Sequence, residues 1–190
     1  MFEHMAFKGS RDLGTRNYSE EEKVLNQILE VDQKIRKAKK KKSVSSVQAL
    51  LKERTILSEK ARQYILSNEV WQTLRAHGAA EINAYTSKDV TGYYAEFPTQ
   101  ALGLWTYLTS EMVLHPVMRD FYSERDVVAE ERRMRIDNNP NGRLLEAFNK
   151  TAFSKSPYKI PTIGSMYEIQ NFTIQGAIDF NVVSSTSGFS

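Results

Sequence analysis

The clearest pattern of apolar and polar positions lies between residues 19 and 68. Before a polar interruption the apolar residues recur every three or four positions: Val24, Leu25, Ile28, Val31, Ile35 and Ala38. After it the same spacing resumes with Val47, Leu50, Leu51, Leu57, Ala61, Tyr64 and Ile65. This period places each set on one face of a helix, and a short polar turn between two such helices predicts an antiparallel helical hairpin. Ser19 and Glu22 have the spacing of a capping box at its start.

Outside this hairpin the pattern alternates between helix and strand. Two β-prone runs between residues 81 and 98 flank a turn near 87–89, which predicts a β-hairpin or two adjacent strands. Helical segments are expected at the N-terminus and at 69–77, 100–114, 123–137, 143–153 and 165–171. Residues 182–190 are expected to form a frayed tail.

These elements predict an α+β fold, with helices packed on a mixed or antiparallel sheet. A length of 190 residues favours one domain. We therefore interpret residues 1–190 as a single domain and residues 19–68 as a helical hairpin inserted into it. Nothing in the hairpin has the pattern of a catalytic motif.

Composition excludes several classes of protein. The absence of cysteine excludes disulfides and thiolate metal sites, and it is compatible with either the cytoplasm or the periplasm. No apolar run reaches the roughly 20 residues that a membrane span needs. The net charge of +3 comes mainly from a lysine-rich run at residues 37–42, which is typical of a solvated helix end or turn. Because no aromatic residue interleaves with these lysines, we expect no nucleic-acid partner.

Two carboxylates lie on the expected helix at 123–137. Glu124 and Glu131 are seven positions apart, so two helical turns place them on one face. The other residues assigned to this face are apolar: Val127, Val128 and Met134. The opposite side carries basic residues: Arg125, Arg132 and Arg133. Carboxylates on an apolar stripe are costly to bury unless they are paired, protonated or bound to a cation. The helix alone leaves ion pairing and cation binding open.

A second set of candidate residues lies at the N-terminus. Zinc catalysis needs three protein ligands, an open position for water and a carboxylate that takes the proton of that water. The inverted zinc motif H-x-x-E-H supplies two histidines and this base. Glu3 and His4 match its last two positions, and its first histidine would fall immediately before Met1. A Glu-His pair alone is also common on surface helices.

The residues that follow resemble a known family. The first similar segment is Glu3-His4-Met5-Ala6-Phe7-Lys8-Gly9-Ser10. It resembles the end of the inverted zinc motif in metallopeptidases of the pitrilysin family. This family includes insulin-degrading enzymes and mitochondrial processing peptidases. Further similar segments follow in the family's order at 83–94, 124–134, 138–140, 157–164 and 169–173. His4 and Glu131 are 127 positions apart, whereas the family leaves seventy-odd; without the 50 residues of 19–68 the interval is 77.

The resemblance implies a role for each matching residue. His4 and Glu131 would be zinc ligands, and Glu3 would be the general base. Glu124 would be a second acid beside the site that orients a ligand. A peptide-binding edge strand would be formed by Asn83, Ala84, Tyr85 and Thr86.

Other residues match no functional position. His77 and His115 are expected at helix boundaries rather than on a metal. Tyr93 and Tyr94 are expected to be core aromatics.

The function implied by the resemblance is that of a zinc-dependent metalloendopeptidase domain, which hydrolyses peptides by attack of a metal-bound water. Its partners would be a peptide or unfolded polypeptide substrate and a second homologous half, fused or separate. The missing first histidine and the unfamiliar sequence after residue 180 lead us to expect a domain truncated at both ends, inactive or weakly active by itself. Two alternatives stay open: a non-catalytic scaffold or partner subunit, and an interaction module formed by the hairpin.

Overall fold

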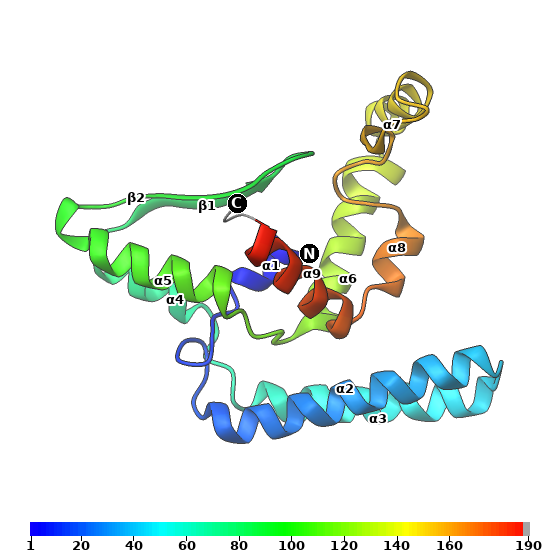
Figure 1. Cartoon of the computed structure of the whole chain (residues 1–190), viewed down its shortest axis with the longest axis horizontal. Helices are drawn as coiled ribbons and strands as arrows, with labels where there is room; N and C mark the ends of the chain where they lie inside the picture. Colours follow the sequence, from blue (N-terminus) through cyan, green and yellow to red (C-terminus); the bar gives the residue numbers. More distant parts are fainter. Residues whose placement is uncertain (188–190) are drawn as a thin grey trace.

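The computed structural model describes residues 1–187 and has an α+β fold, as predicted (Figure 1). Its sheet consists, within these residues, of two antiparallel strands, β1 (Ala80–Thr86) and β2 (Thr91–Glu96). The helices are α1 (Phe2–Ala6), α2 (Tyr18–Lys40), α3 (Val44–Arg62), α4 (Glu69–Ala76), α5 (Leu102–Leu114), α6 (Phe121–Arg132), α7 (Pro140–Ala152), α8 (Met166–Asn171) and α9 (Ile174–Ser187). Short helical turns lie at Thr99–Ala101, Arg133–Asp137 and Pro157–Lys159.

The predicted helical hairpin is formed by α2 and α3, which lie side by side and antiparallel and extend away from the rest of the molecule (Figure 1). The apolar stripe of α2 is buried, as its spacing predicted: Val24, Ile28, Val31, Ile35 and Ala38. The expected capping box is wrong. Asn17 is the N-cap, because its backbone is extended and its side chain accepts a hydrogen bond from the Glu20 backbone N–H at 3.3 Å. Ser19 consequently lies inside the helix.

The base of the hairpin shares a hydrophobic core with the helices around it. Buried side chains from α1, α2, α3, α6 and α9 and from the segment before α6 meet in one cluster: Met5, Val24, Ile28, Ala61, Met118, Phe121, Ile174 and Ala177. This burial removes apolar surface from water and fixes α1 against α6. The hairpin is therefore anchored at the end nearest to α1.

A second cluster fixes the sheet. α4 and α5 lie along one side of the β-hairpin (Figure 1), and their buried residues pack with Ala6 of α1: Val70, Leu74, Leu108 and Met112. Ile82 and Tyr93 from the two strands pack against this cluster. Because Ala6 belongs to it, α1 is held between the sheet and the first core. Gly78 ends α4 with φ +86°, as expected for a glycine at this position.

Several predicted boundaries and faces need correction. α7 begins at Pro140 rather than at 143, because the Asn139 side chain caps it by accepting hydrogen bonds from the N–H groups of Asn141 and Gly142. The expected tail is helical as far as Ser187 in α9, whose sequence contains no proline to interrupt it. Residues 188–190 lie outside the described residues.

The helix face predicted for α6 was partly wrong. Val128 is buried, but Val127 and Met134 are 49% and 68% exposed. Arg132, predicted on the opposite side, is buried because α7 and the loop before α8 cover it. Its guanidinium donates to the Gly164 carbonyl at 2.6 Å and to the Glu146 carboxylate at 3.1 Å. A helical projection gives positions around one helix but not the elements that pack on it.

The tyrosines of β2 differ from each other. Tyr93 is partly buried and its ring lies edge-to-face with Phe7, whereas Tyr94 is 47% exposed, so Tyr94 is not a core residue in the structure. Alternation along a strand sends neighbouring side chains to opposite faces, and only one face of this sheet is covered by α4 and α5. His77 and His115 lie at the C-caps of α4 and α5, as predicted.

Candidate metal centre

The structure brings His4 and Glu131 together, although they are far apart in the sequence. His4 lies on α1 and Glu131 near the C-terminal end of α6, and the distance from His4 Nε2 to Glu131 Oε2 is 3.8 Å. Met5 and Ala6, which follow His4, are fully buried in the two cores and fix the orientation of this short helix. The second Glu131 oxygen pairs with Arg135 at 3.0 Å. One carboxylate oxygen therefore faces the imidazole.

Glu124 contacts the other ring nitrogen of the same histidine. The distance from His4 Nδ1 to Glu124 Oε2 is 3.2 Å, and Lys8 Nζ lies 2.6 Å from Glu124 Oε1. The hydrogen bond from His4, helped by the Lys8 ammonium, lowers the pKa of Glu124 to about 2 in spite of partial burial, which acts in the opposite direction. Both oxygens of Glu124 are thus engaged. A carboxylate on the distal nitrogen of a histidine fixes its tautomer and leaves the other nitrogen available.

These donors fit part of a zinc site. Ligand nitrogen and oxygen atoms lie about 2.1 Å from tetrahedral zinc, which places two ligands of one ion about 3.4 Å apart. The separation of 3.8 Å between His4 Nε2 and Glu131 Oε2 is close to this value. Within residues 1–187, however, no group of three or more His, Cys, Asp or Glu side chains is placed to hold a metal ion. The described residues therefore offer two convergent donors.

Glu3 lies beside this pair and contacts the sheet. The Thr86 hydroxyl, at the end of β1, donates a hydrogen bond to Glu3 Oε2. Glu3, His4 and Glu124 line a cleft of about 470 Å³ together with Asn83 and Ala84 of β1. The cleft thus joins the candidate base, a candidate ligand and the first half of the predicted peptide-binding strand.

The four predicted strand residues have different surroundings. Asn83 and Ala84 face the cleft, and the Asn83 side-chain oxygen accepts the Ala84 N–H at 2.8 Å. Tyr85 is 54% exposed and its ring covers Gly92 on β2, where an added Cβ would lie 2.6 Å from the ring. Thr86 is engaged with Glu3. In the described part of the chain β1 pairs with β2 alone, which leaves the other edge of β1 unpaired.

The sequence did not indicate two residues that shape the site. Arg119 is fully buried, and its guanidinium donates to the carbonyls of Lys8, Ser10 and Leu13 at 3.0, 2.6 and 2.8 Å. It thereby fixes the loop that carries Lys8. Lys8 itself lies within the segment that resembles the zinc motif, but only the structure pairs it with Glu124.

A histidine and a carboxylate that converge beside an open strand edge, on an α+β framework, are features of a metallopeptidase domain. Residues 48–166, more than half of the chain, match the family described as Insulinase (Peptidase family M16). The chain belongs to this family, which confirms the resemblance in its sequence. The matched range includes Glu124, Glu131 and β1, whereas Glu3 and His4 precede it.

Curated relatives and a solved structure agree with this assignment. Zinc protease PqqE of Helicobacter pylori is 35% identical over 127 residues, which cover 66% of this chain and 28% of that protein. An uncharacterized zinc protease of Mycobacterium leprae is 34% identical over 116 residues, covering 60% of this chain and 26% of that protein. The crystal structure of a protease from Helicobacter pylori aligns with a TM-score of 0.58 at 34% identity, covering 62% of this chain and 28% of that one. The chain spans about a quarter of the length of the curated relatives.

None of the helices between residues 1 and 187 combines the length and the apolar character that a membrane span requires.

Proposed function

We propose that the chain carries the zinc-binding and peptide-binding side of a metalloendopeptidase domain that hydrolyses peptides by attack of a zinc-activated water. His4 and Glu131 would be metal ligands, and Glu124 would orient His4. The observation that carries the proposal is the approach of His4 Nε2 to Glu131 Oε2 at 3.8 Å, while Nδ1 of the same ring contacts Glu124 at 3.2 Å. An imidazole with one nitrogen fixed by a carboxylate and the other facing a second carboxylate is the arrangement expected of a metal ligand.

Glu3 would accept the proton of the attacking water and pass it to the leaving amine. Its position supports this role, because it precedes His4 on α1 and lines the same cleft as His4 and Glu124. The hydrogen bond from Thr86 holds the Glu3 carboxylate toward the strand on which a peptide would lie. Zinc, when bound, would supply a Lewis acid that lowers the pKa of water and polarises the peptide carbonyl.

A peptide substrate would bind along β1. The edge of β1 that is unpaired in the described residues offers backbone N–H and C=O groups to an extended chain, as in β-strand addition. Asn83 and Ala84 would lie nearest the scissile bond, because they share the cleft with Glu3 and His4. Tyr85 and Thr86 would continue the strand beyond it. The second homologous half expected for the family would enclose the substrate from the other side.

One observation favours a second candidate, a non-catalytic scaffold or partner subunit of the same family. The described residues bring two donors together rather than the three that catalytic zinc sites use. The retention of Glu3, His4, Glu124 and Glu131 in one place favours the enzyme, because a scaffold has no need of a base beside a ligand pair.

Zinc affinity tests the ligand assignment. We expect Glu131→Gln to weaken zinc binding at least about tenfold in competition with a chromophoric chelator. Glu130→Gln is the matched control, because Glu130 is the neighbouring acid but is exposed and paired with Arg133. Equal affinities for the two variants would refute the assignment of Glu131.

Hydrolysis of a quenched fluorescent peptide separates enzyme from scaffold. With zinc bound, the unmodified chain should cleave the peptide slowly, as expected of this domain by itself, and Glu3→Gln should not cleave it although it keeps its zinc. Equal rates for the two proteins would refute the role of Glu3, and zinc binding without detectable cleavage by the unmodified chain would favour the scaffold.

The hairpin is proposed to be an insertion in this single domain. Its two ends support this, since Thr15 just before α2 and Ile65 just after α3 form an antiparallel bridge. The chain thus leaves the body and returns to it at one place. Removal of the distal part alone, residues 34–52, with a short Gly-Ser linker leaves Glu21, Asp32 and the shared core in place, and should therefore preserve the β-hairpin and the zinc site.

A further inference from the structure

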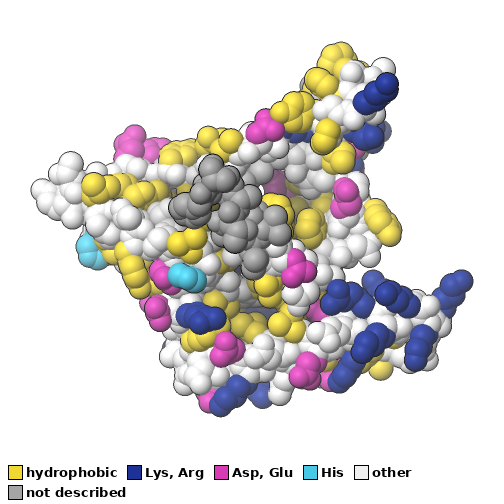
Figure 2. Space-filling model, in the orientation of Figure 1, with side chains coloured by type: hydrophobic (Ala, Val, Ile, Leu, Met, Phe, Trp, Pro, Cys, Tyr) yellow, Lys and Arg dark blue, Asp and Glu magenta, His cyan; other side chains and the backbone are white. Residues whose placement is uncertain are grey.

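The free end of the helical hairpin carries a concentrated positive charge. We define the basic tip as residues 33–52, which are the end of α2, the turn and the first half of α3. It contains no Asp or Glu, and its basic residues are Lys34, Arg36, Lys37, Lys39, Lys40, Lys41, Lys42 and Lys52. The other 170 residues carry 18 basic and 23 acidic side chains, so outside the tip the chain is net negative. Figure 2 shows Lys and Arg side chains gathered over this end of the hairpin.

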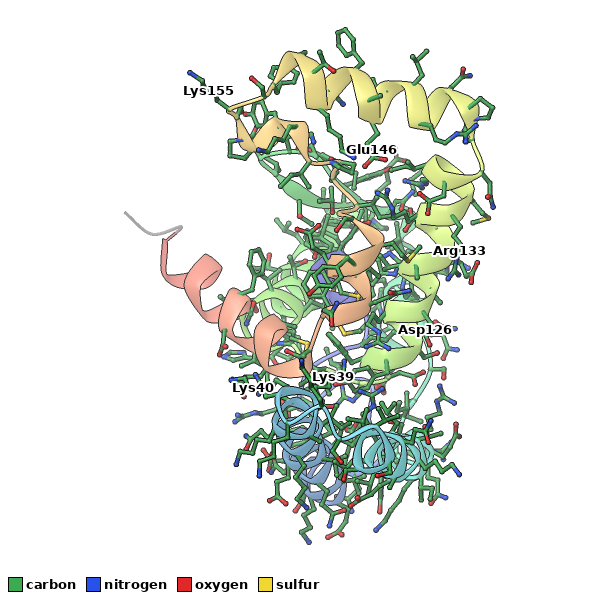
Figure 3. The ribbon with its side chains drawn as sticks, turned by 90° about the vertical axis from the view of Figure 1, so that its right-hand side faces the viewer. Lys39, Lys40, Asp126, Arg133, Glu146 and Lys155 are labelled. Atoms are coloured by element: carbon green, nitrogen blue, oxygen red, sulfur yellow. The ribbon has the colours of Figure 1, made fainter. Side chains whose placement is uncertain are left out.

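The tip is held away from the body of the molecule. The 23 residues of α2 extend about 35 Å at 1.5 Å per residue, and Figure 1 shows the turn at the far end from α1. The arm is fixed at its base by Glu21, which pairs with Arg119 at 2.7 Å, and further along by Asp32, which accepts a hydrogen bond from the Tyr122 hydroxyl of α6. Figure 3 views the hairpin from its tip, with Lys39 and Lys40 labelled. The charge is therefore presented on a firmly anchored arm.

The cations of the tip are available to a partner. All eight side chains are exposed, and among the described residues none of them forms an ion pair within 4.0 Å. Lysines elsewhere do form such pairs, for example Lys23 with Glu20 at 2.5 Å and Lys150 with Glu146 at 3.0 Å. Self-repulsion of eight unpaired cations is unfavourable for the isolated chain, and a polyanionic surface would relieve it.

Helix stabilisation accounts for only part of this charge. Lysines in the last turn of a helix interact favourably with its dipole, and Lys37, Lys39 and Lys40 occupy the last turn of α2. Lys41 and Lys42 lie beyond the helix end, and Lys52 lies in the middle of α3. The helix dipole acts within the last turn only, so it does not account for Lys41, Lys42 and Lys52.

The chemistry of the tip indicates which polyanion it fits. Val44, the first residue of α3, is 70% exposed among the lysines and offers an apolar contact at the end of the arm. The tip contains no aromatic residue on which nucleic-acid bases would stack. Clusters of four to eight basic residues on a helix, combined with an exposed apolar residue, are typical of segments that bind anionic lipid headgroups.

We propose that the basic tip binds reversibly to an anionic lipid surface, with its lysines against the headgroup phosphates and Val44 at the edge of the acyl region. The cleft lined by Glu3, His4 and Glu124 also includes Gly14 and Ile65, which flank the base of the hairpin, so docking of the tip would hold the cleft away from the lipid. This interaction is independent of the proposed peptidase activity and of zinc.

Co-sedimentation with lipid vesicles tests the proposal on the 190-residue chain. One set of vesicles contains phosphatidylglycerol and phosphatidylcholine at about 3:7, and the other contains phosphatidylcholine alone. The test variant carries Gln at Lys39, Lys40, Lys41 and Lys42. The control variant has the same change in charge at exposed cations outside the tip: Lys60, Arg143, Lys155 and Lys159. Circular dichroism of each variant confirms that the helices are retained.

The unmodified chain should bind the anionic vesicles at low salt and not the neutral ones. The tip variant should lose at least about tenfold in partition coefficient, whereas the control variant should lose less than about threefold. Val44→Ser should weaken binding with the charge unchanged. No binding to anionic vesicles, or an equal loss in tip and control variants, would overturn the proposal. Binding of a 20-nucleotide single strand by the tip, without binding to vesicles, would also overturn it and assign the tip to nucleic acid.

Discussion

The guanidinium of Arg119 donates a hydrogen bond from Nε to Glu21 Oε1 at 2.7 Å, and both side chains are fully buried. Glu21 lies in the first turn of α2 and Arg119 lies just before α6, so the pair joins the hairpin to the helix that carries Glu131. The same guanidinium donates hydrogen bonds to three backbone carbonyls of the loop after α1. One side chain thus connects the hairpin, the His4 helix and α6.

Loss of either member of this pair should destabilise the protein strongly. We expect Glu21→Gln or Arg119→Met to lower the free energy of unfolding by about 3–5 kcal/mol, because each leaves a buried polar or charged group without its partner. Urea denaturation followed by circular dichroism measures the change. Lys23→Gln removes an exposed ion pair on the same helix and should have no measurable effect. Similar midpoints for Glu21→Gln and Lys23→Gln would contradict the structural role of the buried pair.

Gly9 and Gly103 should respond in opposite directions to substitution by alanine. Gly9 has φ +92°, and a Cβ there would lie 2.3 Å from the Leu13 carbonyl oxygen. Gly9→Ala should therefore destabilise the loop by about 1–3 kcal/mol and weaken the contact between Lys8 and Glu124. At Gly103, within α5, a Cβ meets no atom within 4 Å, so Gly103→Ala should stabilise by about 0.5–1 kcal/mol. Thermal unfolding of the two variants tests the difference, and a lower Tm for Gly103→Ala would count against it.

Tyr122 should make stability depend on alkaline pH. Its hydroxyl donates to Asp32 of α2, and the cationic groups of Arg54 and Arg125 lie 3.6 and 4.9 Å from the centre of its ring. Burial and the Asp32 carboxylate raise the pKa of Tyr122 well above its usual value, against the opposing effect of the two arginines.

A raised pKa means that the folded state retains the phenolic proton more strongly than the unfolded chain does. The resulting stability is complete below the unfolded pKa of about 10 and is lost as pH rises above it. Denaturation midpoints should be measured from pH 9 to about pH 11.5, a range that includes the unfolded pKa of about 10. As pH rises, the midpoint should fall more steeply in the unmodified protein than in Tyr122→Phe. At pH 7 the same variant should be about 1–2 kcal/mol less stable, because Asp32 loses a hydrogen bond. Parallel pH profiles would contradict this assignment.

Glu124 should affect zinc binding through His4. We expect Glu124→Gln to weaken zinc binding about 10- to 100-fold, as is typical when the carboxylate behind a ligating histidine is lost. Lys8→Met removes the cation 2.6 Å from Glu124 but leaves the contact between Glu124 and His4, so it should change the affinity by less than Glu124→Gln does. Isothermal titration with zinc measures both. Lys155→Met, which removes an exposed cation outside the site, serves as the control and should leave the affinity unchanged.

Much of the local structure was predictable from the sequence. The periodicity of α2 identified its buried face, Gly78 marked the end of α4, and the β-prone runs placed the turn between β1 and β2. These features depend on residues within a few positions of one another. The predicted start of α2 was wrong, because Asn17 and Ser19 are both good N-cap residues. The extended backbone at Asn17 makes this residue the N-cap.

The sequence by itself determined the family and the type of each long element except α9, and it supplied the candidate residues for a metal site. Only the tertiary structure decided which of them meet, because contacts between residues such as His4 and Glu124, 120 positions apart, depend on how the helices pack around shared cores. It also decided that Arg132 is buried, that Thr86 contacts Glu3 and that Arg119 joins three segments. A sequence pattern records the period of one element, whereas the position of a side chain in a site depends on the elements that cover it.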